Sequence, residues 1–200
     1  GTLRYYKYYY KVKAAVDETK GEVLTYQGQL IDPAYHAACG GRTENSEDVW
    51  AFQLPYLRSV TCPYEDDPQS VQTVSFSLEQ FDQALGSSLA AVPVSGNSVG
   101  DSLRVLERTS TGRPKELVVG DRKISALTFR ELLDLRSTNF TWELAGGSIK
   151  ITTTGHGHGV GMCQYGASGM AKHGYNYRVI LGHYYSGAEV TEIESLRQQH

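Results

Sequence analysis

The chain has 200 residues, a mass of 22.1 kDa and a formal net charge of −3 at pH 7. A chain of this mass hides roughly 70% of its unfolded surface on folding, which excludes a disulfide-dependent miniprotein. The mild acidity excludes non-specific nucleic-acid binding, and no run approaches the roughly 18 to 20 apolar residues that cross a bilayer. Because its N-terminus, which begins at Gly1, resembles neither a signal peptide nor an initiator start, we expect a piece of a longer protein.

The first 40 residues are predicted to form strands of an antiparallel meander. Residues 11–19 carry a short apolar run, and residues 21–26 alternate between apolar and polar side chains. Gln27 and Gly28 are typical of a turn before the next strand at residues 30–31. Five tyrosines crowd into residues 5–10, and we interpret them as strand or packing residues rather than a binding platform.

The segment from Cys39 to Val49 turns polar and contains glycines. Such a composition does not bury itself, so we expect a surface loop that ends at Trp50. Loops of this kind are where binding and catalytic residues concentrate.

The middle of the chain predicts a small α+β excursion over residues 73–138. Ser77 and Gln80 form a capping box at the start of a helix over residues 77–85, and Thr128 and Glu131 have the same spacing at the start of a helix over residues 128–135. Residues 86–101 are rich in small residues and are expected to form a flexible connection. Two alternating segments, at residues 103–108 and 115–119, predict a hairpin around the turn Ser-Thr-Gly-Arg-Pro at residues 110–114.

The last third returns to strands at residues 140–144 and 148–153, joined by a Gly-Gly turn. A glycine-rich segment, residues 155–167, then leads into a predicted helix over residues 160–172, and a second short helix follows at residues 177–185. The predicted fold is therefore α+β, a mainly antiparallel sheet with peripheral short helices and the small α+β excursion. We assign residues 1–72 and 139–200 to a main domain and residues 73–138 to the excursion within it.

The glycine-rich segment is the densest chemical signal in the chain. Its histidines His156 and His158 are two residues apart, so an extended segment points both to one side. A helix N-terminus behind them offers unpaired backbone N–H groups that stabilise an oxyanion or bind a sugar oxygen. Glycines that merely permit tight packing are the alternative, and for this cluster we favour function.

A second cluster has a His-x2-Cys spacing at His36 and Cys39, with Cys62 further on. Imidazole and thiolate ligands of this kind suit tetrahedral zinc. A Cys39–Cys62 disulfide, two buried thiols, and pairing of either with Cys163 are the alternatives, and the spacing leaves them open. Cys163, placed early on a helix, also has the ingredients of a nucleophile.

Four blocks of sequence resemble the stage II sporulation protein D / amidase-enhancer family. They are Tyr-His-Ala-Ala-Cys-Gly-Gly-Arg-Thr-Glu-Asn-Ser-Glu-Asp-Val-Trp, Leu-Pro-Tyr-Leu-Arg-Ser-Val, Leu-Arg-Ser-Thr-Asn-Phe and Gly-His-Gly-His-Gly-Val-Gly-Met-Cys-Gln-Tyr-Gly-Ala, at residues 35–50, 54–60, 135–140 and 155–167. They occur in the family's order, and the resemblance covers residues 11 to 190.

The resemblance implies a lytic transglycosylase that cuts the denuded glycan strands of peptidoglycan during spore engulfment. It implies an extracytoplasmic location at the cell wall or sporulation septum, anchored to the membrane only by a segment outside these residues. Glycan strands and other engulfment cell-wall hydrolases are the expected partners. A non-catalytic module that stimulates an N-acetylmuramoyl-L-alanine amidase is the alternative.

The family's catalytic glutamate lies in a Glu-Met-Pro stretch that these residues lack. We therefore expect the catalytic acid upstream of Gly1 and an inactive fragment. No cofactor is required by the resemblance. A structural zinc held by His36, Cys39 and Cys62 stays open, because some family members are similar in carrying zinc near this loop. Other members have serine at the positions of the cysteines. By the resemblance, substrate contacts are expected from the following residues: His36, Gly40, Gly41, Glu44, Asn45, Arg58, His158, Gln164 and Tyr165.

Overall fold

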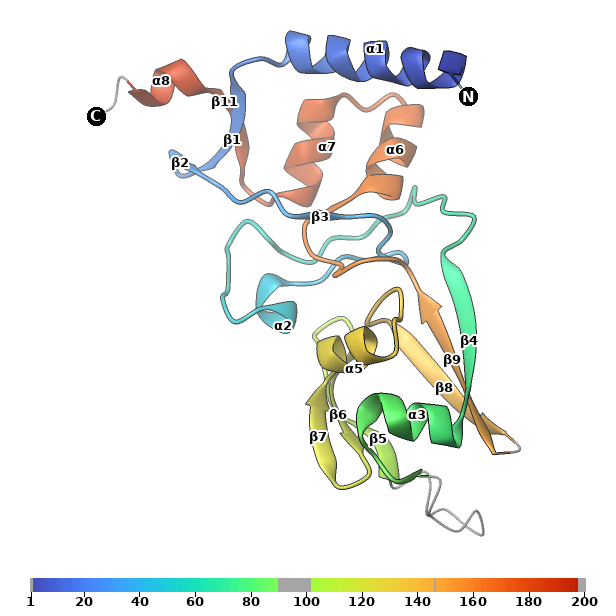
Figure 1. Ribbon diagram of the computed structural model, residues 1–200. Coiled ribbons are helices and arrows are strands. Elements are labelled where there is room, and N and C mark those ends of the chain that lie inside the picture. The colour runs from blue at the N-terminus through green and yellow to red at the C-terminus, as the bar shows by residue number, and fades with distance from the viewer. Residues whose placement is uncertain (1, 90–101, 146, 198–200) are drawn as a thin grey trace. The chain divides into compact units, whose positions relative to one another are not determined.

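The computed structural model describes residues 2–89, 102–145 and 147–197 and divides the chain into two compact units (Figure 1). One unit comprises residues 2–32 and 187–197, and the other comprises residues 33–186. Helices and antiparallel strands alternate along both units, so the predicted α+β class is confirmed. Gly1 lies outside the described residues, and the catalytic acid expected upstream of it stays a prediction.

The first unit combines a helix with a small antiparallel sheet. The sheet has the order β11 (Glu189–Glu192), β1 (Glu22–Tyr26), β2 (Gln29–Leu30), with Glu22 opposite Glu192. Gln27 and Gly28 join β1 to β2 with φ angles of 51° and 78°, the positive pair that a tight hairpin turn requires. This part of the predicted meander is confirmed, and a short helix, α8 (Ile193–Arg197), ends the unit.

The prediction of strands before residue 20 is wrong, because residues 2–18 form the helix α1 (Thr2–Glu18). Tyr9, Val12 and Val16 recur at the three- and four-residue spacing of a helix face, and Lys13 forms an i,i+4 ion pair with Asp17. Helical spacing therefore outweighs the strand preference of the aromatic residues. The predicted packing role of the tyrosines is also wrong where their side chains are described, because each is at least half exposed: Tyr6, Tyr8, Tyr9 and Tyr10.

The second unit contains two antiparallel three-stranded sheets. One has the order β4 (Val71–Ser77), β9 (Ser148–Thr154), β8 (Phe140–Ala145), and β8 and β9 form the predicted C-terminal hairpin. The other has the order β5 (Leu103–Arg108), β6 (Pro114–Val119), β7 (Arg122–Ser125), which confirms the hairpin predicted within the excursion.

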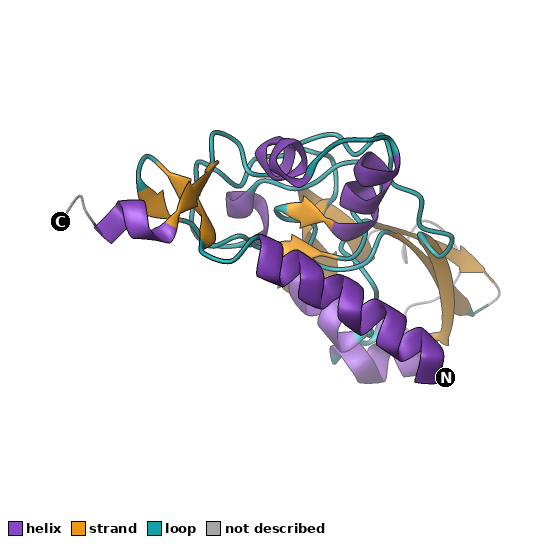
Figure 2. Ribbon diagram, turned by 90° about the horizontal axis from the view of Figure 1, so that it is seen from above, coloured by secondary structure: helices purple, strands orange, loops and turns teal. Residues whose placement is uncertain are grey.

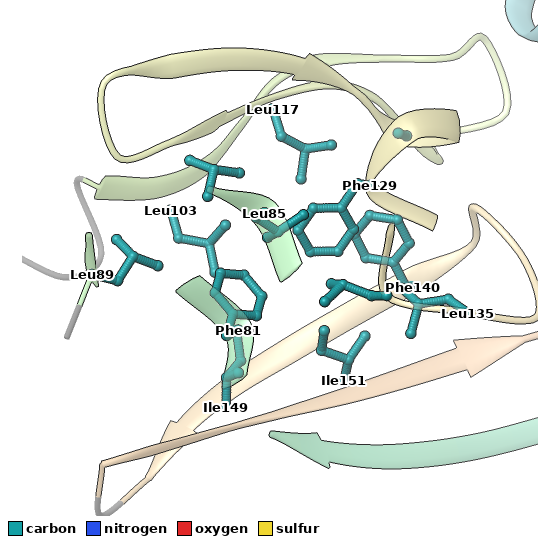
Figure 3. Close-up of a cluster of buried hydrophobic side chains, with 13 residues drawn as sticks. Phe81, Leu85, Leu89, Leu103, Leu117, Phe129, Leu135, Phe140, Ile149 and Ile151 are labelled. Atoms are coloured by element: carbon teal, nitrogen blue, oxygen red, sulfur yellow. The ribbon is translucent and has the colours of Figure 1, made fainter. Parts of the chain in front are cut away.

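Both sheets contribute to one buried apolar cluster (Figure 3). Phe129 stacks on Phe140 with ring centroids 4.8 Å apart, and Phe81 meets Phe129 edge-on at 5.9 Å. Ile149 and Ile151 of β9 are fully buried beneath these rings. Burial of this many apolar side chains is the main stabilising term for this part of the unit. Whether residues 73–138 form a separate excursion stays a prediction.

Two helices cover this cluster. The helix α3 (Leu78–Leu85) has the predicted capping box, in which Ser77 Oγ accepts from the Gln80 backbone N–H at 3.2 Å and Gln80 Oε1 accepts from the Ser77 N–H at 2.9 Å. The helix α5 (Ala126–Leu132) begins and ends earlier than predicted, because Ser125 rather than Thr128 is its N-cap. The predicted flexible connection falls largely at residues 90–101, outside the described residues.

The remainder of the second unit is built mostly of loops between short elements (Figure 2). A short helix, α2 (Ser46–Val49), lies in the segment predicted as a surface loop. Strand β3 (Tyr35–His36) pairs in parallel with β10 (Met162–Cys163), which joins segments 127 residues apart. The helices α6 (Gln164–Lys172) and α7 (Tyr177–Tyr184) follow side by side (Figure 1). The helix predicted over residues 160–172 therefore begins at Gln164, because β10 precedes it and Cys163 is its N-cap.

Candidate functional site

The glycine loop, defined here as residues 155–161, lies directly against the chain segment around β3. A Cβ atom added to Gly157 would lie 2.8 Å from the Cβ of His36, and one added to Gly161 would lie 2.1 Å from the carbonyl oxygen of Ala34. Both glycines also have positive φ angles, of 112° and 71°. The glycines are therefore needed for close backbone packing, which brings two of the predicted motifs together.

The rings of His36, Trp50 and His158, here called the ring cluster, lie close together at the glycine loop in edge-on and tilted arrangements. The His158 ring lies 5.5 Å from the His36 ring and 5.1 Å from the Trp50 ring. His158 Nε2 lies 2.9 Å from the Tyr35 carbonyl oxygen, and His158 Nδ1 accepts from the Val160 N–H at 3.1 Å. Since a carbonyl only accepts, the proton of His158 is assigned to Nε2, and burial lowers the pKa of this imidazole. His158 is therefore a neutral ring held in one orientation.

His36 is the buried member of this ring cluster. Its Nδ1 lies 3.1 Å from the Val160 carbonyl oxygen, so Nδ1 carries the proton, and Nε2 is left as a buried acceptor with no hydrogen-bond partner in the part of the chain that the structure describes. His156 differs, because its side chain is exposed and its backbone pairs with Ala38. The structure thus brings two of the three sequence-selected histidines together with Trp50.

A second buried group, here called the thiol cluster, consists of Cys39, Cys62, Glu65 and Cys163. One ligand atom from each residue lies within 4.8 Å of the ligand atoms of the others. The Glu65 carboxylate accepts from the thiols of Cys39 at 2.7 Å and Cys163 at 3.3 Å, and from the backbone N–H groups of Cys39 and Gly40. All three cysteines are buried thiols, so the structure contains no disulfide among them.

The electrostatics of the thiol cluster favour one thiolate. Hydrogen bonds, first from Cys163 and then from Cys39, lower the pKa of Cys62 to about 4 despite its burial, and the Tyr184 hydroxyl contributes from 2.8 Å. Hydrogen bonds of Cys39, first with Cys163 and then with Cys62, together with burial, raise the pKa of Cys39. Cys163 is fully buried and accepts the Gly166 N–H at the start of α6, so its sulfur is in no position to attack a glycan.

Three sulfur ligands and one carboxylate oxygen match the donor set and number of a tetrahedral zinc site. The predicted set contained Cys39 and Cys62 but took His36 as the third ligand, whereas His36 faces Val160. Glu65 was missed. The one sequence signal that could have identified Glu65 as a ligand is its position three residues after Cys62.

Glu44 lies inside the protein, so the predicted surface loop is wrong at this point. Glu44 is fully buried, and its Oε1 accepts from Arg113 Nε at 2.9 Å and from the Thr111 hydroxyl. Arg113 Nη2 donates to the carbonyls of Cys39 at 2.7 Å and Arg42 at 2.8 Å. Arg113, which sequence reasoning missed, therefore connects the β5–β6 hairpin to the loop that carries Cys39.

Asn45 and Arg58 also make internal contacts. Asn45 Oδ1 accepts from the Ser59 N–H and its Nδ2 donates to the Ser110 hydroxyl, both at 2.8 Å. Arg58 Nη1 donates to Glu47 at 2.7 Å, and this hydrogen bond lowers the pKa of Glu47 to about 2. Of the predicted contact residues, Gly41, Gln164 and Tyr165 are exposed, whereas Gly40 and His158 are partly buried.

Comparison with known proteins places these motifs in context. The chain is 38% identical to stage II sporulation protein D of Bacillus amyloliquefaciens and 35% identical to that of Bacillus subtilis, each over 92% of the chain and 52% of the relative. It is 28% identical to the amidase enhancer of Bacillus subtilis, over 88% of the chain and 32% of that protein. The chain thus spans about half the length of the stage II sporulation proteins it matches.

No protein-family model matches the chain. Within residues 2–89, 102–145 and 147–197, none of the helices is both long and apolar enough for a membrane span. The four sequence blocks that carry the resemblance all lie in the second unit, around the glycine loop and the thiol cluster.

Proposed function

Because the chain is a relative of the stage II sporulation protein D and amidase-enhancer proteins, we propose that the full-length protein is a lytic transglycosylase that cleaves denuded glycan strands of peptidoglycan during spore engulfment. It acts outside the cytoplasm, at the cell wall or sporulation septum, with other wall hydrolases as partners. The observation that carries the proposal is the exposed surface at the glycine loop and the start of α6. Trp50 is exposed beside the neutral His158, and Gln164 and Tyr165 are exposed where α6 begins.

The chemistry assigned to this surface is binding and orientation of the glycan. In a transglycosylase one carboxylic acid protonates the glycosidic oxygen as its bond to C1 of the muramic residue breaks. The carboxylate that is left accepts the proton of the C6 hydroxyl of that residue as the C6 oxygen bonds to C1. In this proposal the acid belongs to a segment upstream of Gly1. Both His158 nitrogens already have backbone partners, so His158 acts by holding the Trp50 ring, while Gln164 and Tyr165 offer the polar contacts to the sugar.

Glycan cleavage by a His158→Ala variant of the full-length protein tests the proposal. We expect release of anhydro-ended products from denuded strands to fall about 10- to 100-fold, because the Trp50 ring loses its support and the strand is misplaced. His183→Ala is the matched control, since His183 also contacts a backbone carbonyl, that of Thr61, but on α7. Unchanged turnover in a folded His158→Ala protein would assign His158 to structure alone.

The second candidate is a non-catalytic module that stimulates an N-acetylmuramoyl-L-alanine amidase, and the similarity to the amidase enhancer favours it. The two functions separate in one assay on purified cell walls. A transglycosylase releases anhydro-ended sugars without any added enzyme. A stimulating module releases none by itself and raises the amide cleavage rate of an added amidase.

The thiol cluster is the proposed site of a structural zinc ion, held by Cys39, Cys62, Glu65 and Cys163. When bound, the ion would link three segments of the second unit and contribute to its folding stability. We expect one equivalent of zinc in the purified protein, loss of that zinc in Cys62→Ser, and a lower melting temperature after chelation. If the native protein contains no metal and the denatured protein has three free thiols, both the zinc site and a disulfide are excluded.

A further inference from the structure

A pocket of about 170 Å³ lies in the second unit between α2 and the N-terminus of α5, helices that lie near each other in Figure 1. It is separate from the thiol cluster but shares Trp50 with the ring cluster of His36, Trp50 and His158. Its lining comes from α2 and the residue after it, the β5–β6 hairpin, the start of α5 and the segment before β8, and includes Glu47, Asp48, Trp50, Pro114, Lys115 and Leu127.

One side of the pocket is apolar and aromatic. Trp50 is 37% exposed, and its ring is packed against the His158 ring. Leu127 and Pro114 contribute aliphatic surface to the same lining. A supported aromatic ring with aliphatic neighbours suits the C–H face of a pyranose, which is flat and apolar while its edge is polar.

The polar part of the lining has a fixed acceptor and a fixed donor. Asp48 Oδ2 accepts from the Ser110 hydroxyl at 2.6 Å and from its N–H at 3.2 Å, which sets the carboxylate in place. Lys115 Nζ lies 3.7 Å from Asp48 Oδ1 and 3.2 Å from Glu107. An ammonium has three donors and a carboxylate has up to four acceptor positions, so both retain capacity for sugar hydroxyl or amide groups.

Size and charge define the ligand further. A pocket of about 170 Å³ is smaller than the roughly 300 Å³ at the lower end for small-molecule sites, so it takes one ring of a longer chain. The lining carboxylates Glu47 and Asp48, with Glu107 beside Lys115, make three negative groups against two positive partners, Arg58 and Lys115. Muramic acid in a denuded strand has a free lactyl carboxylate that this lining would repel, whereas the alternating N-acetylglucosamine is neutral.

We propose that this pocket is a subsite for one N-acetylglucosamine ring of the glycan strand. The inference rests on the proposed function and adds a contribution from the middle of the chain, because the β5–β6 hairpin and α5 supply much of the lining. Trp50 then has two neighbours, His158 on one side and the bound ring on the other, which joins the pocket to the surface beside the glycine loop.

A pair of tryptophan substitutions on α5 tests the subsite in the full-length protein. Leu127→Trp places a large ring in the pocket, and Leu132→Trp places the same ring at a 48% exposed position of the same helix, outside the pocket lining. The probe is a β-1,4-linked tetramer of N-acetylglucosamine, and the readout is its dissociation constant by calorimetry. We expect Leu127→Trp to weaken binding about 10-fold or more, and Leu132→Trp to leave it within about 2-fold.

A second variant, Lys115→Met, keeps the aliphatic stem but removes the donor, and we expect it to weaken tetramer binding without unfolding the protein. If the wild type binds the tetramer and neither Leu127→Trp nor Lys115→Met changes the affinity, the subsite is wrong while the proposed function stands. If the wild type cleaves denuded strands but does not bind the neutral tetramer, the assignment to N-acetylglucosamine is wrong. If it neither binds nor cleaves any glycan, both proposals fall.

Discussion

At the scale of single residues, His158 shows how burial fixes both the protonation and the orientation of a side chain. Its two nitrogens contact backbone groups of Tyr35 and Val160, and its ring lies beside the rings of His36 and Trp50. Burial lowers its pKa in the folded state, whereas an unfolded chain protonates histidine near pH 6.5. The unfolded state therefore binds more protons than the folded state just below that pH.

This difference predicts how stability depends on pH. The contribution of His158 is fully present above about pH 6.5 and is lost as the pH falls below it, since protonation then favours unfolding. We expect the free energy of unfolding of the wild type to fall more steeply between pH 7.5 and pH 5.5 than that of His158→Gln, measured by urea denaturation. Between pH 7.5 and pH 8.5 the two curves should run parallel. Equal slopes below pH 6.5 would contradict the prediction.

At the scale of elements, two glycines in neighbouring helices have opposite surroundings. A Cβ atom at Gly169 of α6 would lie 1.8 Å from the Tyr64 carbonyl oxygen, whereas one at Gly182 of α7 would meet nothing within 4 Å. We expect Gly182→Ala to stabilise the protein by up to about 1 kcal/mol, the helix preference of alanine. Gly169→Ala should destabilise it, because the backbone of Tyr64 has to move. The melting temperatures of both variants test these expectations. A Gly169→Ala protein that melts above the wild type would contradict the close packing of α6 on the Tyr64 backbone.

The elements that could be predicted from sequence are those fixed by local chemistry. Ser77 and Gln80 satisfy each other's backbone groups three residues apart, so the start of α3 could be located from the chain alone. Tyr9 and its neighbours were misassigned because aromatic residues favour strands in general, while only the spacing with Val12 and Val16 shows the helix. Ser125 was overlooked as a cap because Thr128, three residues on, has the same chemistry.

At the scale of the whole second unit, Arg113 joins the β5–β6 hairpin to the loop around Cys39. Its guanidinium is 5% exposed and pairs with Glu44, which is fully buried, while it also donates to two backbone carbonyls. Removing one partner of a buried pair leaves the other charge unpaired. We expect Arg113→Met to cost about 3–5 kcal/mol of unfolding free energy, measured in urea.

The exposed pair of Lys172 and Asp66 supplies the control for this substitution. Their charged groups are 4.0 Å apart, with side-chain exposures of 67% and 84%. Water and salt screen such a pair, so Lys172→Met should leave the unfolding midpoint nearly unchanged. A similar loss of unfolding free energy in Arg113→Met and Lys172→Met would show that burial does not explain how the Arg113–Glu44 pair stabilises the protein.

Long-range contacts set the limit of what the sequence predicts about the site. Cys39 and Cys62 could be selected as ligands by residue type, and Glu65 follows Cys62 by three residues, but Cys163 joins them only through the packing of a segment 101 positions after Cys62 (163 − 62 = 101). The surroundings of Glu44 depend likewise on Arg113, 69 positions later (113 − 44 = 69). Such partners are chosen by the topology of the sheets and loops, and no local pattern encodes that choice.

The parallel pairing of β3 with β10 has a consequence for the order in which the protein matures on the ribosome. Chains emerge from the N-terminus, and compact units fold as soon as their residues are available. The apolar cluster that ends at Ile151 is complete before Cys163 has been added, whereas β3 waits for β10, its partner in the sheet. The thiol cluster is therefore closed late, when the glycine loop returns to the segment around β3, which was made more than 100 residues earlier.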